Sequence, residues 1–451
     1  MIELSNISSI YFVGIGGIGM SAIARYFNAR GKKVAGYDRT ETQLTQALQG
    51  EGMQIHYEDN IELLPSDIDL VVYTPAIPSS HSELLHLRSL GIPVMKRAEV
   101  LGLISNNQRS IGIAGTHGKT TTSVLLTHIL KTAGLDISAF LGGISVDYHT
   151  NCLIGESDVV VLEADEYDRS FLHLHPFIAS ISSMDPDHLD IYGDKNHMIT
   201  AYKSYAAGIQ DGGSLIIREN LLQAFSQDEI MALTQRNIQM ITFGHGSGLV
   251  RIENTHASNG MFVFDYKGPG GNFTQLAFSL PGKHNVENAA VAITIALSLG
   301  VGEDALRAAL SGFRGIKRRF ERIVDTDNVV YIDDYAHHPS ELEAAIDAAR
   351  TLYPGRRISG IFQPHLFTRT RDFAEGFAAA LDKLDEVILM DIYPARELPI
   401  EGVDAGIIFN QMKNNHKQWL PRLQVLEAVK EMKPEVLMTL GAEILICSYL
   451  N

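Results

Sequence analysis

The stretch Gly115-Thr-His-Gly-Lys-Thr-Thr-Thr122 decides the fold of the chain around it. It follows an apolar run at 110–114 that is typical of a buried strand, and it opens a segment of helical spacing that stops at Gly134. A strand, a glycine-rich turn, Lys-Thr and a helix form the layout of a phosphate-binding loop. The loop is a shorter variant of the usual motif, because Ile113 rather than glycine stands six residues before Lys119.

In such a loop, backbone N–H groups and the positive end of the helix dipole hold phosphate oxygens. Lys119 would place a positive charge at the outer phosphates, and the Thr120 hydroxyl would bind Mg²⁺. The alternative is a helix start with an exposed lysine. Gly-Lys-Thr-Thr at a strand-to-helix turn rarely arises for packing alone, so we favour phosphate binding.

Length and composition indicate a globular protein of several domains. The chain has 451 residues, of which 45% are hydrophobic and 20% charged, so two to four domains are expected. The net charge of −16 argues against a nucleic-acid partner. The N-terminus lacks a signal-peptide pattern, and no run of about eighteen apolar residues could span a membrane. Cys152 and Cys447 lie far apart without metal spacing, which predicts buried thiols in a reduced, cytoplasmic setting.

Alternating strand and helix patterns predict three α/β domains. We place a Rossmann-like domain at 1–105, a central domain at 106–313 and a second Rossmann-like domain at 314–451. The central domain should have a P-loop ATPase-like sheet with a small extra β region of short strands at 240–280. We expect a linker at 105–109, a hinge at 314–320, and, among the helices, one at 288–299 and one at 372–384.

The first domain carries a nucleotide fingerprint. Gly14, Gly16 and Gly19 fulfil G-x-G-x-x-G between a strand and a helix, and Asp38 ends the next strand. Taken alone, the pattern favours an NAD-dependent dehydrogenase, with Asp38 on a ribose. The glycine turn senses only a diphosphate, however, so a UDP-sugar fits equally, with Asp38 on a uracil or ribose edge. Glycines that serve only a tight crossover are the structural alternative.

Two acidic segments follow neighbouring strands of the central domain. Glu163-Ala-Asp-Glu-Tyr-Asp168 offers the hard oxygen ligands that Mg²⁺ prefers, although solvated loop acids would look the same. Asp185-Pro-Asp-His-Leu-Asp190 should lie at the same sheet edge. His188 is either a second metal's ligand or an ordinary loop histidine.

Further polar groups precede a helix or follow strands. His284, Asn285 and Asn288 would contact a base or ribose, unless an asparagine only caps the helix. Arg318 and Arg319 supply paired positive charge at the hinge, suited to a transferred phosphate, with surface arginines as the alternative. The segments 333–339 and 363–369 each follow a strand, where open α/β sheets bind ligands.

Taken in this order, the motifs resemble those of the Mur ligase family over the whole chain. The resemblance implies an ATP-dependent ligase that joins L-alanine to the lactyl carboxylate of UDP-N-acetylmuramate through an acyl phosphate, for peptidoglycan synthesis. It implies Mg²⁺, which Mn²⁺ could replace, and a cytoplasmic monomer or weak homodimer.

The site residues that the resemblance implies fall into four sets. The catalytic set is Lys119, Glu163, His188, Arg318 and Arg319, and the metal ligands are Thr120, Glu163 and His188. ATP would contact Gly115, Thr116, His117, Gly118, Lys119, Thr120, Thr121, His284, Asn285 and Asn288. The UDP-sugar would contact Gly14, Gly16, Gly17, Gly19 and Asp38. The amino acid would meet Tyr335, His337, His338, His365, Arg369 and Arg371.

Some features remain open at this stage. Glu166 is expected to be a supporting or solvated acid. Leu366 stands where many relatives have arginine, and Glu443 where glycine is more usual. The nearest alternative is a recycling ligase that adds a whole tripeptide to the same nucleotide sugar. An NAD-dependent oxidoreductase would leave 115–122 without a role, and a non-enzymatic nucleotide switch would leave the other motifs without one.

Overall fold

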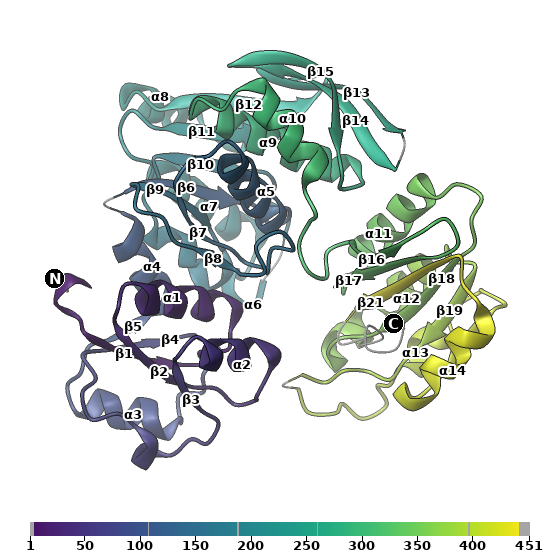
Figure 1. The fold of residues 1–451 in the computed structure, drawn as a ribbon, viewed down its shortest axis with the longest axis horizontal. Coiled ribbons are helices and arrows are strands. Elements are labelled where there is room, and N and C mark those ends of the chain that lie inside the picture. The colour runs from purple at the N-terminus through teal and green to yellow at the C-terminus, as the bar shows by residue number, and fades with distance from the viewer. Residues whose placement is uncertain (1–3, 107, 187–188, 259, 396, 442–451) are drawn as a thin grey trace. The chain divides into compact units, whose positions relative to one another are not determined.

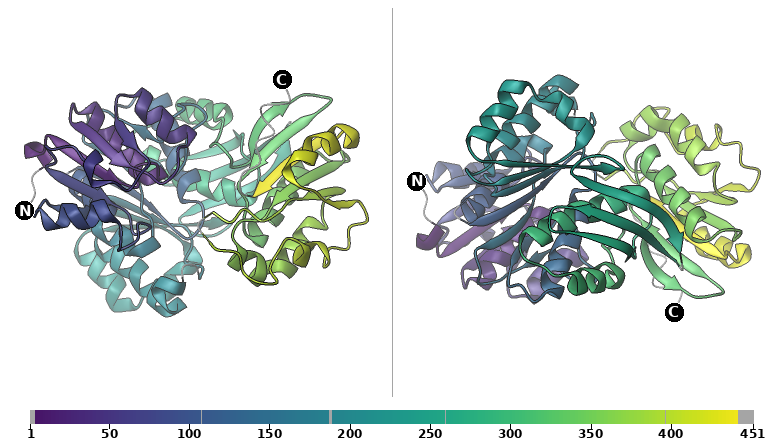
Figure 2. Two further views of the ribbon diagram at one scale, coloured as in Figure 1. Left: turned by 90° about the horizontal axis from the view of Figure 1, so that it is seen from below. Right: turned by 90° about the horizontal axis from the view of Figure 1, so that it is seen from above.

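The computed structural model describes residues 4–106, 108–186, 189–258, 260–395 and 397–441. Two compact units account for this part of the chain. The first contains the described residues of 1–254, 264–276 and 284–312, and the second those of 255–263, 277–283 and 313–451. The described strands form three sheets, each with helices packed against it (Figures 1 and 2).

The N-terminal sheet is parallel, with the order β3-β2-β1-β4-β5. Its strands are β1 (Ser9–Val13), β2 (Lys33–Tyr37), β3 (Gln54–His56), β4 (Leu70–Tyr73) and β5 (Val94–Lys96). Its helices are α1 (Ile18–Ala29), α2 (Gln43–Gly50), α3 (Ser82–Ser89) and α4 (Arg97–Ser105). The strand order reverses between β1 and β4, which is the point where doubly wound sheets bind ligands. The Rossmann-like prediction is confirmed.

Alternation along β1 builds a core on each face of this sheet. Ile10 and Phe12 belong to the cluster that contains the buried residues of α1, and Tyr11 and Val13 to the cluster that contains Leu84 of α3. Burial on both faces explains the unbroken apolar run that predicted this strand. The glycine turn that follows β1 is therefore held on a rigid central strand.

The central sheet has the order β15-β14-β13-β12-β11-β10-β6-β9-β7-β8 among the described strands. The strands are β6 (Arg109–Ala114), β7 (Ser138–Phe140), β8 (Cys152–Leu153), β9 (Val159–Glu163), β10 (Ile178–Ile181), β11 (Ser214–Arg218), β12 (Gln239–His245), β13 (Val250–Ser258), β14 (Met261–Gly268) and β15 (Gly271–Phe278). The helices are α5 (Lys119–Thr132), α6 (Leu189–Tyr192), α7 (Lys195–Ala207), α8 (Gln227–Gln235), α9 (Lys283–Ser298) and α10 (Glu303–Gly312). The extra β region predicted at 240–280 is present, and β12 to β15 continue the main sheet in order.

The C-terminal sheet has the order β16-β17-β21-β18-β19-β20. Its strands are β16 (Glu321–Asp325), β17 (Val330–Asp334), β18 (Ile358–Gln363), β19 (Glu386–Leu389), β20 (Lys417–Trp419) and β21 (Val436–Gly441). Its helices are α11 (Pro339–Leu352), α12 (Phe367–Leu381), α13 (Gly406–Phe409) and α14 (Arg422–Met432). Only β16 is antiparallel to its neighbour among these strands. Short 3₁₀ segments lie at Leu4–Asn6, Ile61–Leu63, Tyr167–His173 and Glu219–Ala224.

Three predicted boundaries differ from the structure. Helix α9 begins at Lys283 rather than 288, because its polar first turn was interpreted as a loop. Helix α12 begins at Phe367 rather than 372, because the segment 363–369 was interpreted as a ligand-facing loop after a strand; the helix has an irregular backbone at Phe373 (φ −120°, ψ 17°). The predicted linker at 105–109 is shorter, since α4 ends at Ser105 and β6 begins at Arg109. Within the described ranges, no helix is long and apolar enough to cross a membrane.

Candidate active site

The phosphate-binding loop connects β6 to α5, as the sequence predicts. Gly115 and Gly118 have positive φ angles of 141° and 82°, which side chains rarely adopt. A Cβ atom on Gly115 would also collide with Ser182 Oγ, and one on Gly118 with the side-chain amide of Asn288. Lys119 is the first residue of α5, so the loop N–H groups and the helix N-terminus face the same point.

Both acidic segments lie beside this loop. β6 pairs with β9 on one side and with β10 on the other, so Glu163 and the residues after Ile181 meet at one sheet edge. Ser183 Oγ accepts a hydrogen bond from His117 N at 2.9 Å, and Thr116 Oγ1 donates to the backbone oxygen of Asp185 at 3.0 Å. The predicted common edge is confirmed. His188 lies outside the described residues.

Lys119 is held by a buried carboxylate. Its Nζ donates to both Glu166 carboxylate oxygens, at 2.7 and 2.9 Å, and to Gly115 O at 2.8 Å. Burial alone would lower the pKa of Lys119, but Glu166, Asp165 and Glu163 outweigh burial and raise it, so the amine stays protonated. Glu166 is 1% exposed. Of the two roles expected for Glu166, the solvated acid is wrong and the supporting acid agrees with the structure, because Lys119 compensates its charge inside the protein.

Glu163 has hard oxygen atoms available. Its Oε1 accepts a hydrogen bond from Thr120 Oγ1 at 3.0 Å. Its Oε2 is buried without a hydrogen-bond partner among the described residues, and a Cβ atom on Gly142 would collide with it. A buried carboxylate oxygen without a donor is costly unless something else binds it. A carboxylate and a hydroxyl at the end of a phosphate loop are suitable ligands for a hard divalent cation.

The other acids of 163–168 have basic partners. Asp165 pairs with Arg97 at 3.4 Å and Asp168 with Lys96 at 2.7 Å. Together with the Lys119–Glu166 pair, this leaves Glu163, within the described part of the chain, as the acid of this segment without a cationic partner. Sequence reasoning missed Lys96 and Arg97, although two adjacent basic residues between a strand and a helix were a visible signal.

The start of α9 lies against the phosphate loop. Asn285 and Asn288 are both buried inside the helix, so the alternative that one of them caps it is wrong. Asn288 Nδ2 donates to Asn285 Oδ1 at 3.3 Å. The structure thus brings this polar turn to the loop, as its proposed contact with a nucleotide requires.

The N-terminal glycine turn is closed by Asp38. Asp38 Oδ2 accepts a hydrogen bond from Gly16 N at 2.7 Å, so this carboxylate binds the turn itself. A Cβ atom on Gly16 would lie 2.7 Å from Thr45 Cγ2, and one on Gly19 would lie 2.7 Å from Arg97 Nη1. Gly17 leaves more room, since the nearest atom would be 3.5 Å away. Glycine is therefore required at positions 16 and 19 because neighbouring side chains leave no room for a Cβ atom.

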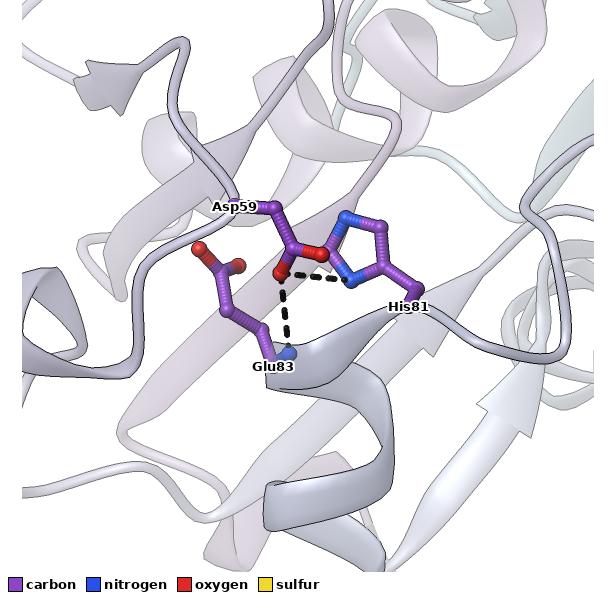
Figure 3. A group of neighbouring side chains, drawn as sticks. All are labelled: Asp59, His81 and Glu83. Atoms are coloured by element: carbon purple, nitrogen blue, oxygen red, sulfur yellow. Dashed lines mark hydrogen bonds and ion pairs between the residues drawn. The ribbon is translucent and has the colours of Figure 1, made fainter.

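A second acid–histidine group lies in the N-terminal sheet domain, formed by Asp59, His81 and Glu83 (Figure 3). The two Asp59 oxygens accept the first two backbone N–H groups of α3, at 2.9 and 3.1 Å. The Glu83 oxygens accept from Asn60 N at 3.0 Å and from the Tyr11 hydroxyl at 2.5 Å. All four carboxylate oxygens are thus used by donors of the protein. We interpret this group as the cap of α3 and not as a metal site.

Aromatic and basic side chains gather at the carboxyl ends of β17 and β18. Tyr335 lies 4.9 Å from His337 and 6.1 Å from His365, between ring centroids, and the Arg318 guanidinium lies 5.0 Å over the Tyr335 ring. Arg369 Nη1 is 3.4 Å from His365 Nδ1. We call these five residues the acceptor group.

Tyr393 joins the acceptor group by stacking on His365 at 5.9 Å. This residue was not proposed from the sequence. Burial is the main cause that lowers the pKa of His337, and the charge of nearby Arg319 contributes. His338 and Arg371 have other contacts: His338 caps α11 and packs on Phe373, and Arg371 is exposed beside Asp372.

Comparison with known proteins follows the same three-part order. Residues 9–109 match the model of the Mur ligase family, catalytic domain, residues 113–296 match the Mur ligase middle domain, and residues 318–447 match the Mur ligase, glutamate ligase domain. A UDP-N-acetylmuramate–L-alanine ligase of Flavobacterium johnsoniae is 45% identical over 444 residues, which are 98% of this chain and 96% of the relative.

Solved structures agree with this result. The UDP-N-acetylmuramate–alanine ligase from Thermotoga maritima superposes with a TM-score of 0.81 at 29% identity, covering 98% of this chain and 97% of its own. A murein peptide ligase from Psychrobacter arcticus gives a TM-score of 0.67 at 23% identity, covering 96% and 95%, and so shares the fold.

Proposed function

The chain belongs to the Mur ligase family, and we propose that it is an ATP-dependent ligase that joins L-alanine to the lactyl carboxylate of UDP-N-acetylmuramate, in peptidoglycan precursor synthesis. The observation that carries the proposal is the 45% identity over nearly the whole chain to a relative named for that reaction. The phosphate-binding loop, the acid with a free oxygen and the acceptor group supply the local chemistry that such a reaction needs.

For ATP, we propose the loop from Gly115 to Thr121, with His284, Asn285 and Asn288 near the nucleoside. Lys119 is already charged and carries its proton at the loop, which suits contact with the outer phosphates. Asn288 lies against Gly118, which supports a polar wall beside the bound nucleotide.

For the metal, we propose Thr120 and Glu163 as ligands of Mg²⁺ or Mn²⁺, with His188 as the ligand of a second ion. The orphaned Oε2 of Glu163 and the adjacent Thr120 hydroxyl fit the preference of Mg²⁺ for oxygen. Such an ion, when bound, neutralises negative charge on the phosphates.

The reaction follows from the poor reactivity of a carboxylate. The lactyl carboxylate attacks the γ-phosphorus of ATP, giving an acyl phosphate and ADP. Lys119 stabilises the charge of the phosphoryl group in transfer, and Arg318 and Arg319 are proposed to assist. The free amine of alanine then attacks the acyl carbon, phosphate leaves, and the amine loses a proton as the amide forms.

We assign four members of the acceptor group to the amino acid, namely Tyr335, His337, His365 and Arg369, and keep Arg318 for the transferred phosphate. His338 and Arg371 stay as proposed outer contacts. We place UDP-N-acetylmuramate at Gly14, Gly16, Gly17, Gly19 and Asp38. We also propose the three-part division at 105/106 and 313/314, a cytoplasmic location in keeping with use of ATP, and a monomer or weak homodimer.

Two other activities are weighed against this one. The recycling ligase that adds a tripeptide uses the same nucleotide sugar, and it would differ in the acceptor. An NAD-dependent oxidoreductase would use the glycine turn but would leave the buried Lys119–Glu166 pair and the acceptor group without a role. The identity to the alanine ligase favours the first proposal over both.

Phosphate release by the purified protein tests the proposal. Release should require ATP, UDP-N-acetylmuramate and L-alanine together with Mg²⁺, and a tripeptide should not replace alanine. The Lys119→Ala variant should lose turnover by a factor of about a thousand or more while its calorimetric affinity for UDP-N-acetylmuramate stays within about twofold. The proposal would be refuted if the tripeptide, and not alanine, supported turnover, or if the protein bound NADH that the sugar nucleotide could not displace.

A further inference from the structure

Arg97 lies between the two nucleotide-related sites of the first compact unit. Its Nη1 would be 2.7 Å from a Cβ atom on Gly19, in the first turn of α1, so the guanidinium rests on the backbone where the glycine turn becomes a helix. Its Nη2 is 3.4 Å from Asp165 Oδ2, beside the phosphate-binding loop. One side chain of the N-terminal sheet domain thus touches both the proposed sugar-nucleotide turn and the acidic segment.

The glycine turn needs a cation if it is to hold a diphosphate. The Asp38 carboxylate lies 2.7 Å from Gly16 N and takes up a backbone donor that a phosphate oxygen could otherwise use. This carboxylate also repels a second anion at close range. Arg97 stands at the same turn with the planar, permanently charged group that matches phosphate oxygens.

Helix stability does not explain where Arg97 lies. It is the first residue of α4 and follows Lys96, so two cations stand at the positive end of a helix dipole. Its pair with Asp165 is partly exposed, with 20% and 35% of the two side chains accessible, and pairs of this kind contribute little to stability. Because this pair is weak, Arg97 can readily exchange Asp165 for an anion that it binds more tightly, such as a phosphate group.

We propose that Arg97 binds the diphosphate of the sugar nucleotide and leaves Asp165 to do so. The inference rests on the proposed function, and it adds a binding residue that the glycine pattern does not contain. The exchange would free the Asp165 carboxylate, next to Lys119, only when the sugar nucleotide is in place, and so would link the occupancy of one site to the charge at the other.

We expect substitutions of Arg97 and of Asp165 to change the dissociation constant of UDP in opposite directions. Arg97→Gln should raise the dissociation constant of UDP by about tenfold to a hundredfold, because a charge-assisted contact is lost. Arg97→Lys should be intermediate, since the charge remains without the fork. Asp165→Asn should lower the dissociation constant by about two- to fivefold, because Arg97 no longer has to break an ion pair.

Calorimetry on the full chain with UDP and UDP-N-acetylmuramate measures these effects. Lys96→Gln is the matched control, since it removes the neighbouring pair with Asp168 and should leave UDP binding within about twofold. Thermal unfolding checks that each variant is folded.

The outcomes separate this inference from the proposed function. If Arg97→Gln bound UDP as tightly as the wild type, or Asp165→Asn bound UDP more weakly, the inference would be overturned. The proposed function would still stand, provided that the wild-type protein binds the sugar nucleotide. A loss seen with UDP-N-acetylmuramate but not with UDP would place Arg97 on the lactyl carboxylate and overturn the diphosphate assignment. Wild-type protein that binds neither ligand would remove both.

Discussion

The acids of the segment 163–168 differ in their neighbours rather than in their chemistry. Glu166 is buried against Lys119, whereas Glu163 keeps an oxygen without a donor among the described residues. The same carboxylate therefore serves as a counter-ion at one position and as a free ligand at the other. This difference can be tested by removing each charge in turn while keeping the shape of the side chain.

We predict that Glu163→Gln and Glu166→Gln have different defects. Glu163→Gln should raise the Mg²⁺ concentration for half-maximal turnover by about tenfold or more, because a carboxylate ligand is lost. Glu166→Gln should lower the free energy of unfolding by about 3 kcal/mol, because Lys119 loses its buried counter-ion. Magnesium titration and urea unfolding followed by circular dichroism measure the two effects. Equal metal dependence in both variants would contradict the assignment of Glu163.

Single-residue roles were only partly predictable from the sequence. Gly118, Lys119 and Thr120 could be recognised because a phosphate loop is local: strand, turn and helix start are consecutive. The family resemblance already separated Glu163, as a metal ligand, from Glu166, as a supporting or solvated acid. The burial of Glu166 against Lys119 could not be predicted, because the two residues are distant in sequence.

At the level of elements, the turn between β1 and α1 is set by space as well as by backbone freedom. Gly16 lies close to Thr45 and Asp38, whereas Gly17 has no neighbour within 3.4 Å of its Cβ position. We predict that Gly16→Val weakens UDP-N-acetylmuramate binding by at least about tenfold, because a side chain at this crowded position distorts the turn and blocks the approach of its backbone to the diphosphate.

Gly17→Ala is the matched variant for this turn, and it should cost less than Gly16→Ala. Calorimetry of the three variants with UDP-N-acetylmuramate and with ADP gives the comparison, and ADP affinity should not change. Equal losses at positions 16 and 17 would mean that crowding by Thr45 and Asp38 is not the cause.

The end of β17 carries a partly buried carboxylate, Asp334, whose raised pKa lies in an accessible range. Burial raises the pKa of Asp334 from 3.8 to about 6, against the lowering effect of hydrogen bonds from Phe320 N and Ala336 N. A pKa that is higher in the folded state than in the unfolded state favours folding at low pH. The contribution of Asp334 is therefore complete below about pH 4 and is lost as the pH rises to about 6.

We predict that the free energy of unfolding falls by about 3 kcal/mol more in the wild type than in Asp334→Asn over this pH range, because the asparagine cannot titrate. Urea unfolding of both proteins between pH 4 and pH 7, followed by the fluorescence of Trp419 in the same compact unit, measures the difference. Asp372→Asn is a suitable control, because Asp372 is exposed and its pKa is lowered by Arg371. A difference between wild type and Asp334→Asn that does not vary with pH would contradict the burial argument.

Elements were predictable where apolar periodicity is strong. Strand β6, for example, was predicted at 110–114 and extends over Arg109–Ala114. The starts of α9 and α12 were missed, because polar residues in the first turn of a helix look like a loop in the sequence. Most of the acceptor group was found by its position after two strands and Arg318 by its place in the hinge, but the contact of Tyr393 depends on a further segment.

For the whole molecule, the ligand groups are divided between two compact units. The phosphate loop, the acids and the glycine turn belong to the first unit, and the acceptor group belongs to the second. Buried apolar clusters occur within each unit, for example around Phe12 in the first and around Ile361 in the second. Units with their own cores can unfold separately, and a ligand stabilises only the unit that binds it.

The sequence contains one tryptophan, Trp419, and it lies in the second unit, where its Nε1 donates to Asp391 Oδ1 at 2.9 Å. We predict that ADP with Mg²⁺, at about a hundred times its dissociation constant, raises the free energy of unfolding of the first unit by about 2.7 kcal/mol. The unfolding transition reported by Trp419 in the second unit should not change. Urea unfolding followed in parallel by circular dichroism and by tryptophan fluorescence makes the comparison. Lys119→Ala should abolish the shift, and His365→Ala should keep it, since His365 belongs to the acceptor group. If ADP moved both signals together by the same amount, the two units would unfold as one, and the division of binding between them would be wrong.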